Sequence, residues 1–259
     1  MTATPAKKTE LDPAYSYIPE LYNLRYENPE GDKQSEEFFL ADVDGETRRY
    51  NIHDYASLYS VAWLYDIALY HNLRCETPTE MSAAIKGVWT EHGVDAGALK
   101  MLELGAGSGA FGHELRHTLG VGHLVGLDIE PKAKAAAIRD RTGLYDDYLV
   151  ADLTALGDLE GKLKAEKYTC VGMASATGWG NHIPVAGFEE GFKLLEPGGW
   201  FIFHVKPNDP DPECIALNDW VVDKIATGQL DEKYRASHFH RQSSGGGEIY
   251  YDVVLGVKS

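Results

Sequence analysis

The sequence predicts an α/β protein in which a mostly parallel sheet follows an aromatic-rich N-terminal extension. After residue 98, short apolar runs alternate with helical patterns, as expected where strands and crossover helices alternate along a parallel sheet. One apolar run ends in a glycine-rich loop, Gly105–Gly109. The last two strand-like runs, 233–242 and 248–257, are joined by a short turn and must be antiparallel. We therefore expect an extension over 1–97 and a catalytic or binding domain over 98–259.

Two elements are predicted in the extension beyond residues 1–12, which we expect to be disordered. The run 36–52 is predicted to form a hairpin around Asp44-Gly45, a pair that favours tight hairpin turns. The run 54–73 is predicted to be a helix with apolar and aromatic residues on two faces, and 79–90 a further helix after Pro78. A helix that is apolar on two faces usually lies between other elements, and core packing alone would also explain its aromatic residues.

The sequence after residue 98 predicts seven strands, most of them separated by helices. The strands are expected at 99–104, 123–128, 148–151, 168–174, 200–205, 233–242 and 248–257, and the helices at 111–119, 131–141, from about 152 to 167, 185–195 and 214–226. A turn is expected at Glu196-Pro-Gly-Gly199, just before the fifth strand.

Composition narrows the classes of partner. The chain has 259 residues, 44% of them hydrophobic, and a formal net charge of −16, which repels phosphate backbones and anionic membranes. No apolar run approaches the roughly 18 residues that span a bilayer, and the N-terminus lacks the apolar region of a secretory signal. Three widely spaced cysteines indicate neither a disulfide framework nor a cysteine–zinc site. We expect a cytoplasmic protein that acts on a small molecule; its oligomeric state is not specified by the sequence.

Polar residues follow three successive predicted strands. Glu103 stands at the end of the first strand, just before the glycine loop; Asp128 ends the second; and Asp152-Leu153 follow the third. Glycines let a ligand approach the backbone closely, and a carboxylate after the second strand can accept the ribose hydroxyls of an adenosine ligand. The loop also reads as G-x-G-x-x-A, which suits a nicotinamide-dependent oxidoreductase. Asp152 alone is also explained as a helix N-cap.

These pieces, in this order, resemble the class I S-adenosylmethionine-dependent methyltransferase superfamily, of small-molecule type. The motifs are LELGAGSG, GLDIE, VADLTAL and EPGGWFIFHV, from about Lys100 onward. The resemblance implies a Rossmann-like seven-stranded sheet with an antiparallel C-terminal strand, and S-adenosylmethionine as cofactor. The cofactor residues that it implies are Glu103 at the methionine amino group, Gly105, Gly107 and Gly109 at the methionine moiety, Asp128 with Ile129 at the ribose, Asp152 and Leu153 at the adenine, and Ala174 and Ser175 closing the pocket.

The helix 54–73 resembles a further pattern of small-molecule methyltransferases, in which an aromatic residue precedes Ala-x-x-Tyr-Asp. Tyr55-Ala-Ser-Leu-Tyr59 matches it, with Ser60 in place of the aspartate. Tyr65-Asp66 offers a competing register. We assign Tyr59 to the cofactor and Tyr55 to the substrate.

The loop after the fourth strand supplies the candidates for chemistry. Open α/β sheets bind ligands at the carboxyl ends of their strands, and this loop carries Trp179, which could stack on a planar substrate, and His182. A histidine titrates near neutral pH, so His182 is our candidate base for an acceptor that must lose a proton; an exposed loop histidine is the alternative.

His113-Glu114-Leu-Arg-His117 matches the H-E-x-x-H zinc signature, but its helix begins directly after the glycine loop and no third ligand follows at the expected spacing. We therefore expect no metal and treat a zinc hydrolase as a minor alternative. His238 and His240 share one strand face and are expected to be ordinary core or surface histidines. The leading hypothesis is methyl transfer to an O, N or S atom of a small molecule; a non-catalytic ligand-binding module is a further alternative.

Overall fold

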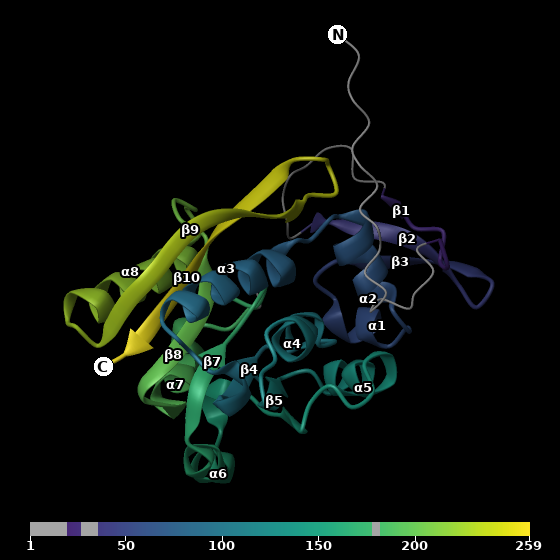
Figure 1. Cartoon of the computed structure of the whole chain (residues 1–259). Coiled ribbons are helices and arrows are strands. Elements are labelled where there is room, and N and C mark those ends of the chain that lie inside the picture. The colour runs from purple at the N-terminus through teal and green to yellow at the C-terminus, as the bar shows by residue number, and fades with distance from the viewer. Residues whose placement is uncertain (1–19, 27–35, 178–181) are drawn as a thin grey trace.

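The computed structural model describes residues 20–26, 36–177 and 182–259, and within them it contains two sheets (Figure 1). A small antiparallel sheet has the order β1-β2-β3, and a seven-stranded sheet has the order β6-β5-β4-β7-β8-β10-β9. Within the large sheet, β4 to β8 pair in parallel, while β10 runs antiparallel between β8 and β9. The predicted fold class is confirmed, including the antiparallel strand near the C-terminus.

The strands agree with the predicted runs to within a few residues. Their bounds are β1 (Arg25–Tyr26), β2 (Phe38–Val43), β3 (Glu46–Asn51), β4 (Lys100–Leu104), β5 (His123–Asp128), β6 (Asp147–Val150), β7 (Tyr168–Gly172), β8 (Leu195–Val205), β9 (Leu230–Gln242) and β10 (Glu248–Lys258). The hairpin β2–β3 turns at Asp44 and Gly45 as predicted, with φ values of 54° and 79° that suit a tight hairpin turn. The short strand β1, which pairs with β2, carries no strong sequence signal and was not predicted. The expected disorder of residues 1–12 falls outside the described residues.

One strand begins earlier than predicted. The turn expected at 196–199 is part of β8, which starts at Leu195, and Gly198 there has a φ of 80°. The pairing with β7 shifts register between Tyr168 and Cys170, as in a strand that carries a bulge. The glycine therefore bends the strand and does not end it.

The helices flank the large sheet on both faces. They are α1 (Tyr55–Tyr59), α2 (Leu64–Asp66), the π-turn η2 (Ile67–Asn72), α3 (Thr77–Glu91), the 3₁₀ turn η3 (Ala96–Ala98), α4 (Ala110–His113), the π-turn η4 (Glu114–Thr118), α5 (Pro131–Asp140), the 3₁₀ turn η5 (Leu153–Ala155), α6 (Asp158–Glu166), α7 (Val185–Leu194) and α8 (Pro212–Ala226). No helix in the described ranges is long and apolar enough to cross a bilayer.

The single helix predicted over 54–73 is wrong, because the structure divides it into α1, α2 and η2. Trp63 has a left-handed backbone, with a φ of 59°, and its N–H donates to Asp140 Oδ2 at 3.3 Å. The Arg139 guanidinium donates to the carbonyl oxygens of Tyr59 and Val61 at 3.1 and 3.2 Å. These carbonyls would face the next turn of a continuous helix, so the contact with α5 replaces helix hydrogen bonds at the break.

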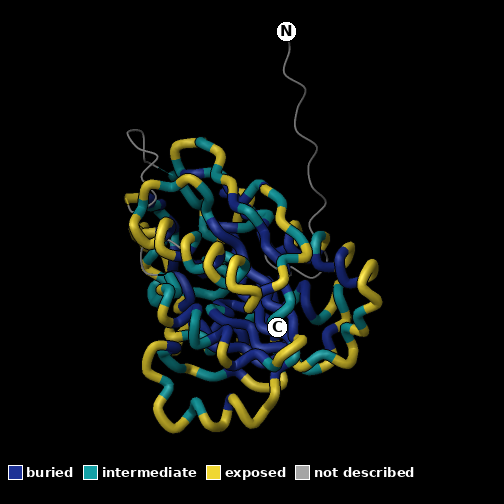
Figure 2. Tube along the Cα trace, turned by 90° about the vertical axis from the view of Figure 1, so that its left-hand side faces the viewer, coloured by how far each residue is buried: buried dark blue, intermediate teal, exposed yellow. Residues whose placement is uncertain are grey.

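Two apolar layers cover the sheet, and Figure 2 shows the buried residues gathered in the interior of the molecule. On one face, α6, α7 and α8 pack through residues such as Leu163, Phe188 and Val221. On the other, α3 and α4 pack through Ile85 and Phe111. Helix α3 thus belongs to the same core as the large sheet, although it precedes residue 98. The predicted division at 97/98 stays a prediction.

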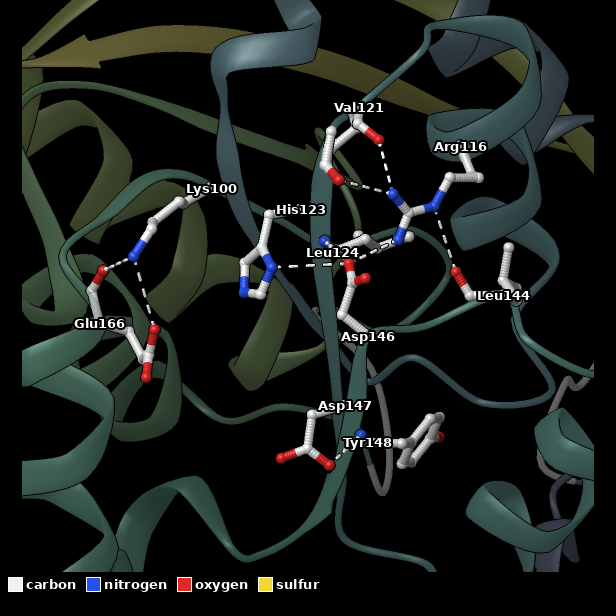
Figure 3. A network of polar contacts seen from close by, with 11 residues as sticks. Lys100, Arg116, Val121, His123, Leu124, Leu144, Asp146, Asp147, Tyr148 and Glu166 are labelled. Carbon is white, nitrogen blue, oxygen red and sulfur yellow. Dashed lines mark hydrogen bonds and ion pairs between the residues drawn. The ribbon is translucent and has the colours of Figure 1, made fainter.

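A polar network at the amino ends of the strands fixes the turn after η4 (Figure 3). Arg116 donates to the carbonyl oxygens of Val121, Gly122 and Leu144 at 2.9, 2.8 and 3.2 Å, and pairs with Asp146 at 2.6 Å. Arg116 is the fourth residue of the H-E-x-x-H stretch. Its contacts give that segment a structural role in the connection between η4 and β5.

Two buried ion pairs join the N-terminal region to the large sheet and its helices. Arg141 pairs with Asp66 at 2.6 Å, and their side chains are 5% and 1% exposed. Arg241 of β9 pairs with Glu37 at 2.6 Å, with side chains 3% and 0% exposed. The long hairpin β9–β10 also reaches the N-terminal region in Figure 1, where the Gln242 N–H donates to the Leu73 carbonyl at 2.7 Å. The N-terminal elements are therefore held in one place against the sheet.

Replacing Arg141 by alanine tests this attachment. The change leaves Asp66 buried without its countercharge, so we expect the free energy of unfolding to fall by about 3–5 kcal/mol. The matched control is Arg235→Ala, which removes a half-exposed pair with Glu232 and should cost at most about 1 kcal/mol. Urea denaturation measures both variants, and equal losses in the two would contradict the assignment.

Candidate functional site

A large cavity lies at the carboxyl ends of the parallel strands. It encloses about 1020 Å³ of empty space, its open mouth included, and is lined by the segments that follow β4, β5, β6 and β7. Residues of α1, α2 and η2 form the opposite wall. The cavity thus lies where the parallel sheet meets the N-terminal extension, the place expected for a ligand in an open α/β sheet.

Most residues singled out from the sequence meet in this cavity. Those that line it are Tyr55, Tyr59, Glu103, Gly105, Gly107, Asp128, Ile129, Asp152, Leu153, Ala174, Ser175 and His182. Two do not. Gly109 is not among the lining residues, and Trp179 lies outside the described residues.

The glycine loop is held in one shape by two hydrogen bonds at Gly107. Its N–H donates to Asp128 Oδ2 at 2.8 Å, and its carbonyl accepts from the Tyr148 hydroxyl at 2.8 Å. Its φ is 54°, and a Cβ there would lie 2.6 Å from the Tyr59 hydroxyl oxygen. Glycine is required both by the left-handed backbone and by this close approach.

Gly109 has a different task. It caps the start of α4 with a φ of 93°, and a Cβ would lie 2.7 Å from Leu144 Cδ2. The structure therefore gives this glycine a role in packing the first turn of the helix.

Asp128 sits at the end of β5 with both carboxylate oxygens engaged by backbone donors. Oδ2 accepts from Gly107 and Oδ1 accepts from Glu130 at 2.9 Å. Each oxygen keeps acceptor capacity for a further donor, such as a ligand hydroxyl. Burial raises the pKa of Asp128, and the two backbone N–H groups oppose that rise.

Asp152 is the N-cap of η5, which is one of the two roles predicted for it from the sequence. Its Oδ1 accepts from the Thr154 N–H at 2.8 Å and from the Thr154 hydroxyl at 2.7 Å, at the start of η5. The bonds from Thr154 lower the pKa of Asp152, which stays ionised at neutral pH. The same residue lines the cavity beside Leu153, so capping and ligand contact are compatible.

Glu103 is the buried acid of the site. It is 2% exposed, and the Tyr145 hydroxyl donates to its Oε2 at 2.8 Å. Burial raises the pKa of Glu103 to about 8. A buried carboxyl of this kind is ready to receive a cationic group, which would favour its ionised form.

The two tyrosine registers read from the sequence both reach the cavity. The Tyr59 hydroxyl lies close to the glycine loop, as described above. The Tyr65 ring packs against the Tyr59 ring, with ring centroids 4.9 Å apart. The break after α1 allows both to face the ligand space. The Tyr55 hydroxyl lies 3.0 Å from His182 Nε2, which ties α1 to the segment that follows β7.

A second, smaller cavity adjoins the first. Its empty space, open solvent included, is about 470 Å³, and it shares Tyr55, Tyr65, Ser175 and His182 with the large one. Its further polar lining comes from the ends of β8 and β9 and from His53: the residues are His53, His204, His240 and Arg241, with Tyr251 of β10 beside them.

Two histidines of this second cavity, His204 and His240, are deeply buried. Burial lowers the pKa of His204 and of His240 well below the usual range. His240 Nδ1 lies 2.7 Å from the Thr77 hydroxyl oxygen, and His238 Nε2 lies 3.0 Å from the same oxygen. His238 and His240 are therefore core histidines, one of the two readings predicted.

His204 and Arg241 were not singled out in the sequence, whereas Tyr65 was named there as the competing register. A signal for His204 existed, since it is the one polar residue in the apolar run Trp200–Val205 and lies near the carboxyl end of that strand. Arg241 carries no comparable signal, because its place in the wall depends on the packing of distant segments.

The zinc alternative finds no support in this geometry. The rings of His113 and His117 lie together, 4.6 Å between centroids, on α4 and η4. Across residues 20–26, 36–177 and 182–259, no group of three or more His, Cys, Asp or Glu side chains is placed to hold a metal ion.

The pKa of Glu103 predicts how the ligand-free protein responds to pH. Because its folded-state pKa, about 8, lies above the usual 4.5, the protonated carboxyl favours the folded state, and this contribution is full below pH 4.5 and lost as pH rises toward 8. We expect the free energy of unfolding to fall over this window, by about 1.4 kcal/mol for each unit of pKa difference, and Glu103→Gln to remove that fall. Urea denaturation across pH 4.5–8, with the exposed Glu91→Gln as control, measures it. Parallel profiles for the Glu103 variant and the parent would contradict the assignment.

Comparison with known proteins agrees with this fold. Residues 102–203 match the family model described as "Methyltransferase domain". The N-methyltransferase NodS from Bradyrhizobium japonicum, solved with S-adenosyl-L-homocysteine, superposes with a TM-score of 0.54 at 17% identity, covering 80% of this chain and 97% of that one. A putative RNA methyltransferase from Pyrococcus horikoshii gives 0.51 at 13% identity, covering 71% and 87%. No curated protein matches the sequence.

The residues of the large cavity fit S-adenosylmethionine, the cofactor that the sequence motifs predict. A nucleoside attached to an amino acid needs a close backbone approach, acceptors for two hydroxyls and an acid for its ammonium group. Gly105 and Gly107 leave that space, Asp128 keeps acceptor capacity and Glu103 is the buried acid. The chain thus matches a methyltransferase domain over residues 102–203 and has the fold of solved methyltransferases, one of them bound to S-adenosyl-L-homocysteine, which supports S-adenosylmethionine as the methyl donor.

Proposed function

We propose that this enzyme transfers the methyl group to an O, N or S atom of a small molecule bound beside the methyl donor. The observation that carries the proposal is the wall of the large cavity, which brings Tyr55 and Tyr65 of the extension together with Ser175 and His182 of the segment after β7. The large cavity would hold the methyl donor, and the acceptor would meet it at these four residues.

The proposed placement of the donor follows the wall residues. Asp128 would accept the ribose hydroxyls, with Ile129 beside the ribose, and Leu153 would pack on the adenine while Asp152 accepts from its amino group. Glu103 would lie at the methionine ammonium, and Gly105 and Gly107 would leave room for the methionine chain. Ala174, Ser175 and Tyr59 would close the pocket around it.

The chemistry asked of the protein is mainly positioning. The donor, when bound, supplies a methyl group already activated by a sulfonium charge. The walls would hold an acceptor atom in line with that group, and fixing two reactants in this way is worth about 7–11 kcal/mol of the barrier at best. His182 would take the proton from an acceptor that must lose one, and the 3.0 Å contact with the Tyr55 hydroxyl would orient its ring.

The charge balance favours a small molecule over a nucleic acid. One solved neighbour is titled a putative RNA methyltransferase, but this chain carries a formal charge of −16. Such a surface repels phosphate backbones and anionic membranes. We propose neither nucleic acid nor membrane as partner. The free thiols Cys75, Cys170 and Cys214 fit a reducing compartment, which supports a cytoplasmic location.

Asp128→Ala tests the cofactor placement. The variant loses hydrogen bonds between a carboxylate and two hydroxyls, so we expect S-adenosylhomocysteine to bind at least about tenfold more weakly by calorimetry. Asp147→Ala, at the opposite end of the parallel strands, is the control. Because Asp128 also holds the Gly107 loop, thermal unfolding of the free variant is measured alongside. An unchanged affinity in a folded Asp128 variant would remove it from the ribose site.

Transfer of label tests the proposed function. The enzyme is incubated with methyl-labelled S-adenosylmethionine and a cell extract that is then separated into small molecules, nucleic acid and protein. We expect the label in the small-molecule fraction. Label confined to RNA or protein would refute the proposal.

His182→Ala tests the proposed base once the acceptor is isolated. For a hydroxyl acceptor, kcat should fall by about 10²–10⁴-fold, and the decline of activity toward low pH should disappear from the pH profile. The affinity for S-adenosylhomocysteine should stay the same. For a free amine or thiolate the loss should be small, since the proton leaves before binding. The exposed His92→Ala is the matched control. Full activity of His182→Ala on a hydroxyl acceptor at pH 6–9 would exclude this role.

A further inference from the structure

The end of helix α5 joins the glycine loop of the large cavity to the N-terminal extension. Arg141 is the C-cap of α5, and its side chain is 5% exposed. One guanidinium nitrogen, Nη1, donates to the Ser108 carbonyl oxygen at 3.1 Å, and the other, Nη2, donates to Asp66 Oδ1 at 2.6 Å. A single buried side chain thus contacts both the loop after β4 and helix α2.

On the loop side, Arg141 holds a peptide unit of the cavity wall. Ser108 lines the large cavity and is 2% exposed. The carbonyl of the next residue, Gly109, is the one that accepts from the N–H four residues further along, at 2.9 Å, so the Ser108 carbonyl belongs to the loop. The Gly109 N–H, in the same peptide unit, donates to the Ala106 carbonyl at 2.9 Å. Arg141 therefore fixes this unit from its carbonyl side, as Tyr148 fixes the unit before it.

On the extension side, Arg141 binds the residue that follows Tyr65. Tyr65 lines the large cavity, whereas Asp66 is 1% exposed and does not. Among the described residues, the second carboxylate oxygen of Asp66, Oδ2, has no hydrogen-bond partner. The stability of this buried carboxylate therefore depends on Arg141. The Trp63 ring also packs on the guanidinium, with its centroid 5.2 Å from Arg141 Cζ.

Arginine suits this position because its guanidinium is planar. The two terminal nitrogens point in fixed directions, so the Ser108 carbonyl and the Asp66 carboxylate are bound at a fixed separation. A lysine ammonium is a point charge on a flexible chain and sets no such separation. The neighbouring residue strengthens the attachment, since Asp140 Oδ2 accepts from the Trp63 N–H at 3.3 Å.

We propose that Arg141 is a positioning residue for the methyl donor, which couples the glycine loop to the tyrosine wall of the extension. Arg141 itself does not line the large cavity. Through Ser108 it keeps the loop in the shape that leaves room for the donor, and through Asp66 it keeps Tyr65 in the facing wall. Donor binding and docking of the extension then stabilise each other, because such coupling is reciprocal. The inference rests on the proposed placement of the donor and not on the identity of the acceptor.

A pair of apolar replacements separates positioning from stability. Arg141→Met together with Asp66→Leu removes both charges, so neither stays buried without a partner, and exchanges of this kind are often neutral or stabilising. The Ser108 carbonyl loses its donor in this double variant. We expect S-adenosylhomocysteine to bind it about tenfold more weakly by calorimetry, while the midpoint of urea unfolding stays close to that of the parent protein.

The other buried ion pair supplies the matched control. Arg241→Met together with Glu37→Leu makes the same chemical change at a pair that also attaches the N-terminal region, but neither residue lines the large cavity. We expect this double variant to keep the affinity of the parent protein for S-adenosylhomocysteine. A purely structural role of Arg141 would give the two double variants the same affinity.

The amide resonance of Gly109 reports on the loop directly, because its N–H belongs to the peptide unit whose carbonyl Arg141 binds. In spectra of the ¹⁵N-labelled protein without ligand, this resonance should shift in the Arg141 double variant and keep its position in the control. Arg141→Lys gives the answer if the double variant does not fold. It keeps a positive charge beside Asp66, and we expect it to show the same shift and about tenfold weaker binding of S-adenosylhomocysteine.

Unchanged affinity in a folded Arg141 variant, an equal loss in the two double variants, or a Gly109 resonance that does not move would each overturn the inference. The proposed function fails by different results. Absence of S-adenosylhomocysteine binding to the parent protein would reject the placement of the donor, and label that enters only RNA or protein would reject the small-molecule acceptor.

Discussion

The hydrogen bond from the Gly107 N–H to the Asp128 carboxylate, at 2.8 Å, is the contact on which the site is built. It joins the loop after β4 to the end of β5 and keeps the glycine backbone in a left-handed shape that glycine adopts without strain. The Tyr148 hydroxyl holds the other side of the same peptide unit. With the loop fixed in this way, its bare backbone can face a ligand on one side and the Tyr59 hydroxyl on another.

The N-terminal region depends on charges that are buried against the sheet and its helices. The pairs Arg141–Asp66 and Arg241–Glu37 have little exposure, so they add less net stability than their short distances suggest. Their effect is on geometry, since any other docking would leave one of these charges buried without a partner. Arg139 of α5 has a similar effect, because its guanidinium donates to the carbonyl oxygens of Tyr59 and Val61 at the end of α1. The tyrosines of α1 and α2 therefore face the cavity in one defined arrangement.

The hairpin β9–β10 gives the protein its second cavity. Because β10 is inserted between β8 and β9, the carboxyl ends of β8 and β9 and the start of β10 meet at one edge of the sheet. His204, His240 and Tyr251 come together there, and Arg241 extends the contact to Glu37 of the N-terminal region. The segments after the parallel strands line the large cavity, and the antiparallel addition and the extension together line the second.

The sequence by itself determined the large sheet, the hairpin at Asp44-Gly45 and most of the donor-side residues. Local residue patterns predict these features, because strands and helices differ in their hydrophobic period and glycines mark the loop after β4. Asp128 and Asp152 come at the ends of strands, and the carboxyl ends of parallel strands meet at one edge of the sheet. Gly109 belongs to the glycine motif, but it packs against Leu144 at the start of α4 and does not line the cavity. The motif alone therefore did not predict which of its glycines face the ligand space.

Only the tertiary structure decided the break after α1, the closeness of Tyr55 to His182 and the gathering of His204, His240 and Arg241 around one cavity. The break depends on Arg139, 80 residues from the carbonyl of Tyr59 that it binds, and the Tyr55–His182 contact joins residues 127 apart. The free energy of such contacts comes from burial and from charges or hydrogen bonds matched across the fold. No local pattern of residues records which distant partner will be present, so this part of the site had to be read from the folded chain.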